Sequence, residues 1–221
     1  GYKDLLSNES HPIRTGGHGP TSSKDLRTRL LFQAMKIPLK HVTGYKSGGK
    51  IRAAILKNEL DMTADSLAGY YGRVVAQLIK PGISVPIWHI GTPGPNNTIL
   101  HSPTVPKGIP SFQEVYEEKF GKGARPDRLV WDAIRTIGAS REMLRILVFR
   151  KGTDPKAVAE MRAAWDKTMV DKAFLADYAK VNGSAFTGKS GAAAQAYVKT
   201  IVNVPADLEK FLLDYANAAR G

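Results

Sequence analysis

Residues 13–23 read IRTGGHGPTSS, and this stretch joins a predicted strand to a predicted helix. The first three residues form a short extended run. After the glycine-rich turn, apolar side chains recur at helical spacing between Ser23 and Met35, at Leu26, Leu30, Leu31 and Ala34. Glycines let a backbone approach a ligand closely, and a helix N-terminus offers free N–H groups. The stretch predicts a strand–loop–helix unit with a ligand-facing loop; the alternative is a tight turn with a serine cap.

Two similar units follow along the chain. A predicted strand at residues 40–43 leads to a helix that opens at Gly48-Gly49, and a third strand at 60–64 leads to a helix from about Ser66 to Ile79. Residues 84–90 are typical of a fourth strand. Alternating strands and helices with short connections predict an α/β fold with a mainly parallel sheet and helices on both faces. Ligands bind where the strand-to-helix loops of such a sheet converge.

The second half of the sequence predicts fewer strands and more helices. Residues 91–108 are rich in Pro, Gly and Asn and predict a long loop, and residues 145–149 predict a strand. A capping box from Ser111 to Glu114 starts one helix, and another covers about residues 127–137. Four more helices are expected: one beginning at Asp154-Pro155, one carrying Phe174 and Tyr178, one after Ser190 and one near Pro205.

Three loops supply the candidate ligand-binding residues. These are Gly17, His18, Gly19, Thr21 and Ser22; Tyr45, Ser47, Gly48 and Gly49; and Asp65 and Ser66. The second loop has the spacing G-x-x-x-x-G-K, but position 51 is Ile where a nucleotide-binding loop needs Ser or Thr for magnesium, which argues against nucleotide binding. Asp65 either caps a helix or accepts a hydrogen bond from a ligand hydroxyl, amine or protonated carboxyl group.

Composition restricts the class of partner. The 221 residues carry a formal net charge of +12, which favours anionic partners, and they contain no cysteine, which excludes disulfides and thiolate chemistry. No apolar run approaches the ~20 residues that cross a bilayer, so we expect no membrane insertion. No nucleic-acid-binding signature is present. The five histidines lack metal-site spacing, and we expect no catalytic residue, metal or cofactor.

The order of the motifs resembles the Bug-type solute-binding receptors of tripartite tricarboxylate transporters. The resemblance spans nearly the whole chain. It is carried, after the first unit, by residues 41–49 (HVTGYKSGG), which hold one residue more than the Tyr-x-Gly-Gly of the family, and by residues 60–66 (LDMTADS), similar to its acidic loop. The later motifs are residues 102–106 (SPTVP) and 149–155 (FRKGTDP), which resemble a Pro-x-Val-Pro stretch and a Gly-Thr-Pro helix start.

The resemblance implies a two-lobed fold of the periplasmic-binding-protein type II, the Venus flytrap. The implied function is capture of a small organic carboxylate in the bacterial periplasm and its transfer to membrane transporter subunits. On this resemblance we expect the chain to begin where the second lobe of the family begins, and no signal peptide is visible in its polar opening residues. Residues 1–144 are therefore expected to form the complete lobe 2, and residues 145–221 a helical segment of a partial lobe 1.

Two other functions stay open on the sequence alone. One is a receptor-like module that binds a signalling or envelope protein instead of serving transport. The other is an enzyme in which His18 or Asp65 acts on an anionic substrate. Within the loop, His18-Gly19-Pro20 is bulkier and stiffer than the usual Gly/Ser loop of the family, so ligand choice is expected to differ.

Overall fold

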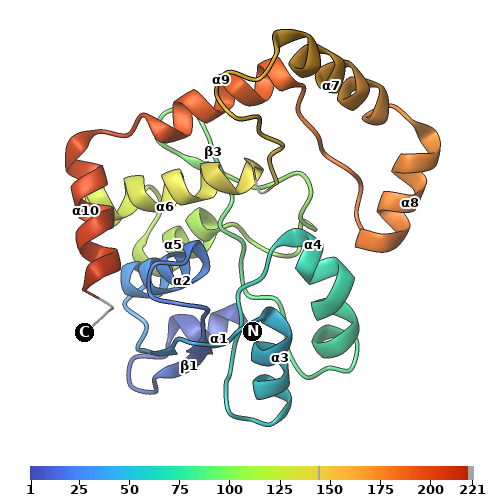
Figure 1. Ribbon diagram of the computed structural model, residues 1–221. Coiled ribbons are helices and arrows are strands. Elements are labelled where there is room, and N and C mark those ends of the chain that lie inside the picture. Colours follow the sequence, from blue (N-terminus) through green and yellow to red (C-terminus); the bar gives the residue numbers. More distant parts are fainter. Residues whose placement is uncertain (144, 219–221) are drawn as a thin grey trace.

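The computed structural model describes residues 1–143 and 145–218, and it has an α/β fold (Figure 1). About 52% of the chain is helical, and the strands of the described residues form two small two-stranded sheets. The chain opens with the short helix α1 (Tyr2–Leu6). Among the described helices, none has both the length and the apolar character needed to cross a membrane.

The first predicted unit is confirmed. Strand β1 (Ile13–Gly16) pairs in parallel with β2 (Leu39–Val42), with Ile13 opposite Leu39 and Gly16 opposite Val42. Helix α2 (Ser23–Ala34) connects the two strands and begins where Ser22 accepts a hydrogen bond from the Asp25 N–H at 3.2 Å. Parallel strands need such a crossover connection because the end of the first strand and the start of the second lie at opposite edges of the sheet.

The second and third units are confirmed in their helices, but the third is reduced in its strand. Helix α3 (Gly48–Leu56) begins after the cap Ser47, and α4 (Leu67–Gly69) begins after Ser66 and continues into the π-helix η1 (Tyr70–Ile79). Between them, residues 60–64 lie beside β1 but form only one parallel bridge, from Thr15 to Met62. The sheet is therefore smaller than predicted.

The prediction of a fourth strand at residues 84–90 was wrong. Within this segment one parallel bridge joins His89 to Ser111, and Pro86 lacks the N–H group that a ladder needs. The predicted loop 91–108 contains a short antiparallel hairpin, β3 (Thr92–Pro93) and β4 (Ile99–Leu100). Its turn places Asn96 and Asn97 at positive φ angles of 51° and 58°, which asparagine tolerates better than most residues.

The main core lies between the helices that follow. Helix α5 (Phe112–Phe120) begins with the predicted capping box, in which the Ser111 N–H donates to Glu114 Oε2 at 2.6 Å. Helix α6 (Arg128–Ser140) packs against α2 and ends in the 3₁₀ turn η2 (Arg141–Met143). Fully buried side chains of α2, α5 and α6 meet here, including Phe32, Phe112 and Trp131.

The four predicted C-terminal helices are present. They are α7 (Pro155–Thr168), capped by Asp154, α8 (Lys172–Asn182), α9 (Gly191–Val202) and α10 (Ala206–Asn217). Helices α7, α8 and α9 have no buried residue among those described, whereas α10 returns to the core through Leu208 and packs on α6. Figure 1 shows α7 and α8 at the periphery of the molecule.

The predicted strand at residues 145–149 was also wrong. This segment forms no strand with any described residue, and it leaves four consecutive apolar side chains exposed, with Leu147 at 70% and Val148 at 82%. A continuous apolar run forms a buried strand only where neighbouring strands pair with it. The proposed boundary at residue 144 lies outside the described residues, and the division into lobes stays a prediction.

Candidate anion-binding site

A cavity of about 240 Å³ lies where β1, β2 and the bridging segment at Met62 end. The loops after these three segments run into the N-termini of α2, α3 and α4, and all three helices contribute residues near their first turns. The lining residues are His18, Ser22, Ser23, Lys24, Arg27, Gly48, Ala64, Asp65, Ser66, Arg141 and Arg145. The cavity therefore occupies the place at which the strand–loop–helix pattern predicts a ligand.

The structure brings together part of the predicted set. His18, Ser22, Gly48, Asp65 and Ser66 line the cavity, whereas Gly17, Gly19, Thr21, Tyr45, Ser47 and Gly49 do not. Two of the latter have structural roles instead. The Ser47 hydroxyl caps α3 by accepting from the Lys50 N–H at 3.3 Å, and the carbonyl oxygen of Tyr45 lies 2.8 Å from Nδ1 of His18.

Three N–H groups of the glycine loop donate to acceptors of the protein itself. The Gly17 N–H donates to the Val42 carbonyl at 2.8 Å, and the Ser22 N–H donates to the Gly19 carbonyl at 2.9 Å. The His18 N–H donates to Asp25 Oδ2 at 2.9 Å. Recognition of an anion at this loop therefore depends on side chains and on the first N–H groups of the helices, which have no intrahelical acceptor.

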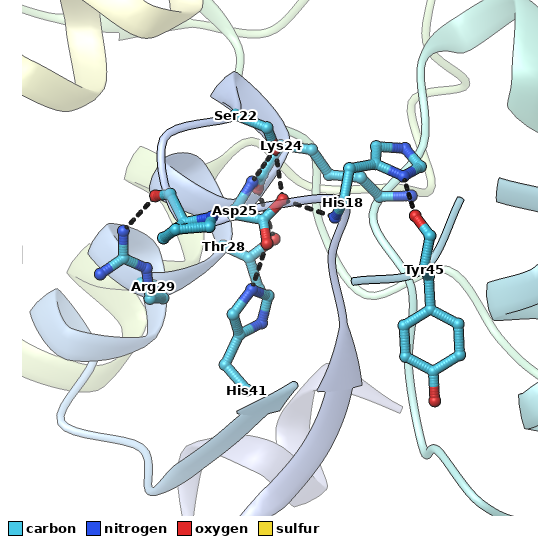
Figure 2. Close-up of polar contacts among 9 residues, drawn as sticks. His18, Ser22, Lys24, Asp25, Thr28, Arg29, His41 and Tyr45 are labelled. Carbon is cyan, nitrogen blue, oxygen red and sulfur yellow. Dashed lines mark hydrogen bonds and ion pairs between the residues drawn. The ribbon is translucent and has the colours of Figure 1, made fainter. Parts of the chain in front are cut away.

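Asp25 holds the glycine loop in place through hydrogen bonds (Figure 2). Its carboxylate is fully buried and accepts hydrogen bonds from the His18 N–H, from the Ser22 hydroxyl and, at 2.7 Å, from Nε2 of His41. Burial acts to raise the pKa of Asp25, but the hydrogen bonds outweigh it and hold that pKa below its usual range. The loop is therefore held by hydrogen bonds to an ionised carboxylate.

The His18 ring is held in one tautomer. Its Nδ1 lies 2.8 Å from the Tyr45 carbonyl oxygen, which can only accept, so Nδ1 carries the proton. In the neutral ring Nε2 is then the basic nitrogen. An imidazole fixed in this way can accept a hydrogen bond from a ligand or take up a proton.

Four basic side chains line the cavity, and the sequence interpretation had not assigned them to the site. They are Lys24 and Arg27 on α2, Arg141 at the start of η2, and Arg145. Burial lowers the pKa of Lys24 and of Arg141, and it lowers the pKa of Arg27 to about 10. Nearby positive charges act in the same direction on each of them.

Among the residues that line the cavity, Arg27 is the one that most strongly indicates a bound anion. Its side chain lies on the cavity wall, the residue is 8% exposed, and within the described part of the chain its guanidinium has no hydrogen-bond or ion-pair partner. A buried cation without a partner is costly, and natural proteins place one where a ligand or a partner supplies the opposite charge.

The single acidic side chain of the described lining does not neutralise this cluster. Arg52, which is not part of the lining, donates through Nη1 to Asp65 Oδ2 at 3.2 Å and through Nε to Gln77 at 2.7 Å. Asp65 Oδ1 accepts from the Ser66 N–H at 3.0 Å. Asp65 is thus both a loop cap and a cavity residue, and the cavity keeps an excess of positive charge.

Part of this site was present as a signal in the sequence. Lys24 and Arg27 are three residues apart on α2, so both face the same side of the helix. Ser22 and Asp25 have the spacing of a capping box, which indicates a carboxylate at the helix start. Arg141 and Arg145 have no such signal, because they reach the cavity only through the packing of α6.

Comparison of this chain with models of protein families, with curated proteins and with solved structures found no match.

Proposed function

We propose that this chain is a solute-binding receptor that captures a small organic carboxylate. The proposal includes a fold of the periplasmic-binding-protein type II, an extracytoplasmic location and delivery to a tripartite tricarboxylate-type transporter, as the sequence motifs suggest. Arg27 is the observation that carries the binding function, because a buried guanidinium on a cavity wall with no partner among the described residues needs an anion.

Three further features support a carboxylate as the ligand. Arginine matches the planar geometry of a carboxylate with two parallel N–H groups, and the cavity holds three arginines. Helix N-termini favour negative charge, and three of them surround the cavity. A volume of about 240 Å³ suits a small molecule and is too small for a folded or polymeric partner.

Thermal unfolding in the presence of candidate ligands tests the proposal. The screen compares succinate, citrate and benzoate with glucose and a short DNA duplex, each over a range of concentrations. A carboxylate at a hundred times its dissociation constant adds about 2.7 kcal/mol to the free energy of unfolding, and the melting temperature rises. Stabilisation by DNA or glucose and by no acid would contradict the proposal.

A second candidate function is favoured by the exposed apolar residues 146–149. Patches of this kind mark protein–protein contacts, which suits a receptor-like module that binds a signalling or envelope protein. The two functions differ in their dependence on the cavity. Arg27→Leu weakens acid-dependent stabilisation in the transport receptor, whereas capture of a protein partner is lost with Leu147→Asp and not with Arg27→Leu.

A further inference from the structure

We propose that Lys24 is a reactive lysine that captures an anionic carbonyl compound, such as a 2-oxo acid, as a covalent imine. The inference rests on the proposed carboxylate site, because the arginines of that site would hold the acid group of the same molecule. It adds a reaction to what is otherwise a binding cavity.

The position of Lys24 is the first argument. Lys24 lies in the first turn of α2 and lines the cavity, and it is the only lysine that does so among the described residues. Its ammonium group forms no hydrogen bond or ion pair with any other described residue, and its side chain is partly buried. A lysine that is neither paired nor fully solvated keeps its nitrogen available to a molecule in the cavity.

The electrostatic surroundings of Lys24 favour the neutral amine, which is the nucleophilic form. Burial has the largest effect and lowers its pKa; the charges of Arg27 and Arg52 also lower it, whereas those of Asp65 and Asp25 raise it. Lysines become reactive in proteins when desolvation lowers their pKa in this way. Arg27, Arg141 and Arg145 line the same cavity and would supply the acid anchor.

Groups that can move protons lie on the same wall. Figure 2 shows the Lys24 side chain extending towards His18, and both residues line the cavity. The tautomer fixed by the Tyr45 carbonyl leaves His18 Nε2 as an acceptor, and Asp65 provides a carboxylate. Dehydration of a carbinolamine requires proton transfer from nitrogen to the departing oxygen, which such groups assist.

The step balances without any further reactant. The lone pair of the Lys24 amine attacks the carbonyl carbon and forms the C–N bond of a carbinolamine. The former carbonyl oxygen then leaves as water with the two protons that the amine nitrogen gives up, and a C=N bond remains. No oxidation or reduction takes place.

Reductive trapping tests the reactive lysine. The protein is incubated with pyruvate and sodium cyanoborohydride and mapped by peptide mass spectrometry. We expect Lys24 to gain the mass of pyruvate less one oxygen atom, at least tenfold faster than Lys50, an exposed lysine in the first turn of α3. Lys24→Arg, which keeps the charge and lacks the primary amine, should lose this adduct, and Arg27→Leu should slow its formation. Acetone, which has the carbonyl and lacks the acid, should label Lys24 poorly.

The failure of this inference is distinguishable from the failure of the proposed function. If succinate raises the melting temperature while pyruvate labels Lys24 no faster than Lys50, the carboxylate site stands and the reactive lysine is overturned. If pyruvate labels Lys24 selectively and no acid lacking a carbonyl group stabilises the protein, the reactive lysine stands and the receptor function is overturned. Equal labelling by acetone and pyruvate overturns the anchoring role of the arginines and with it the proposal.

Discussion

His41 Nε2 lies 2.7 Å from Asp25 Oδ1, and the two side chains are 7% and 0% exposed. The pair joins β2 to α2 beneath the loop that forms one wall of the cavity. Asp25 also accepts hydrogen bonds from the His18 N–H and the Ser22 hydroxyl. This one carboxylate therefore fixes the positions of the loop backbone at His18 and of the Ser22 side chain, which belong to the same cavity wall.

Gly17 and Gly19 should respond very differently to an added methyl group. A Cβ atom at Gly17 would lie 1.7 Å from Asp25 Oδ1, whereas at Gly19 it would meet nothing within 4 Å. We expect Gly17→Ala to destabilise the fold by about 2–4 kcal/mol, because Asp25 must leave its hydrogen bonds. Gly19→Ala should stay within about 0.5 kcal/mol. Urea unfolding of both variants measures the difference, and equal effects would contradict the packing of Asp25 under Gly17.

Asp25 should make the protein sensitive to strong acid. Its pKa in the folded state lies below the value of about 3.9 expected in the unfolded chain. Its contribution to stability is therefore present above pH 4 and is lost as the pH falls through the folded pKa. The isosteric variant Asp25→Asn should cost about 2–4 kcal/mol at pH 7 and should flatten the loss below pH 4. An unchanged acid profile in the variant would exclude Asp25 as the cause.

His89 predicts a second loss of stability at a higher pH. Burial, with the nearby ring of His101, lowers the pKa of His89 to about 4, whereas the unfolded value is about 6.5. The folded state therefore binds fewer protons between these values, and stability falls by about 2–3 kcal/mol as the pH drops from 6.5 to 4.

The variant His89→Gln should remove most of this second pH dependence, because glutamine does not titrate. Urea midpoints at pH 7 and pH 5 for the variant and the native protein give the comparison. A similar decrease in both proteins would assign the effect to another group.

Replacing Arg27 should lower the affinity for the ligand without lowering the stability of the unliganded protein. Arg27→Leu removes a buried charge that has no partner within the described residues, so the unliganded protein should be as stable as before or more stable. Carboxylate affinity should fall about 10- to 100-fold, the effect of losing one charge-assisted hydrogen-bonded contact.

Arg27→Lys is the matched control, because it keeps the charge and loses the bidentate hydrogen-bonding geometry. Its carboxylate affinity should lie between that of the native protein and that of Arg27→Leu. Calorimetric titration with the best acid of the thermal screen measures all three. A loss of stability without a loss of affinity would make Arg27 a structural residue.

The sequence predicted the local elements well where a local signal fixes them. Apolar spacing placed α2 and α3, and caps placed α5 and α7. In the structure the Ser22, Ser47, Ser111 and Asp154 side chains each satisfy an N–H group within three residues of themselves. The strands at 84–90 and 145–149 were predicted from apolar runs alone. A strand requires a partner from elsewhere in the chain, and such a run does not specify one.

The candidate site shows the same division. The sequence by itself determined that three loops lie between extended segments and helix starts, because turn residues and caps act over a few positions. Only the tertiary structure decided that Asp25 uses the N–H group of His18, that His41 lies opposite it, and that Arg27 and Arg141 line one cavity. These contacts join residues up to about a hundred positions apart, and they form through the packing of α2, α6 and the sheet, which no local pattern encodes.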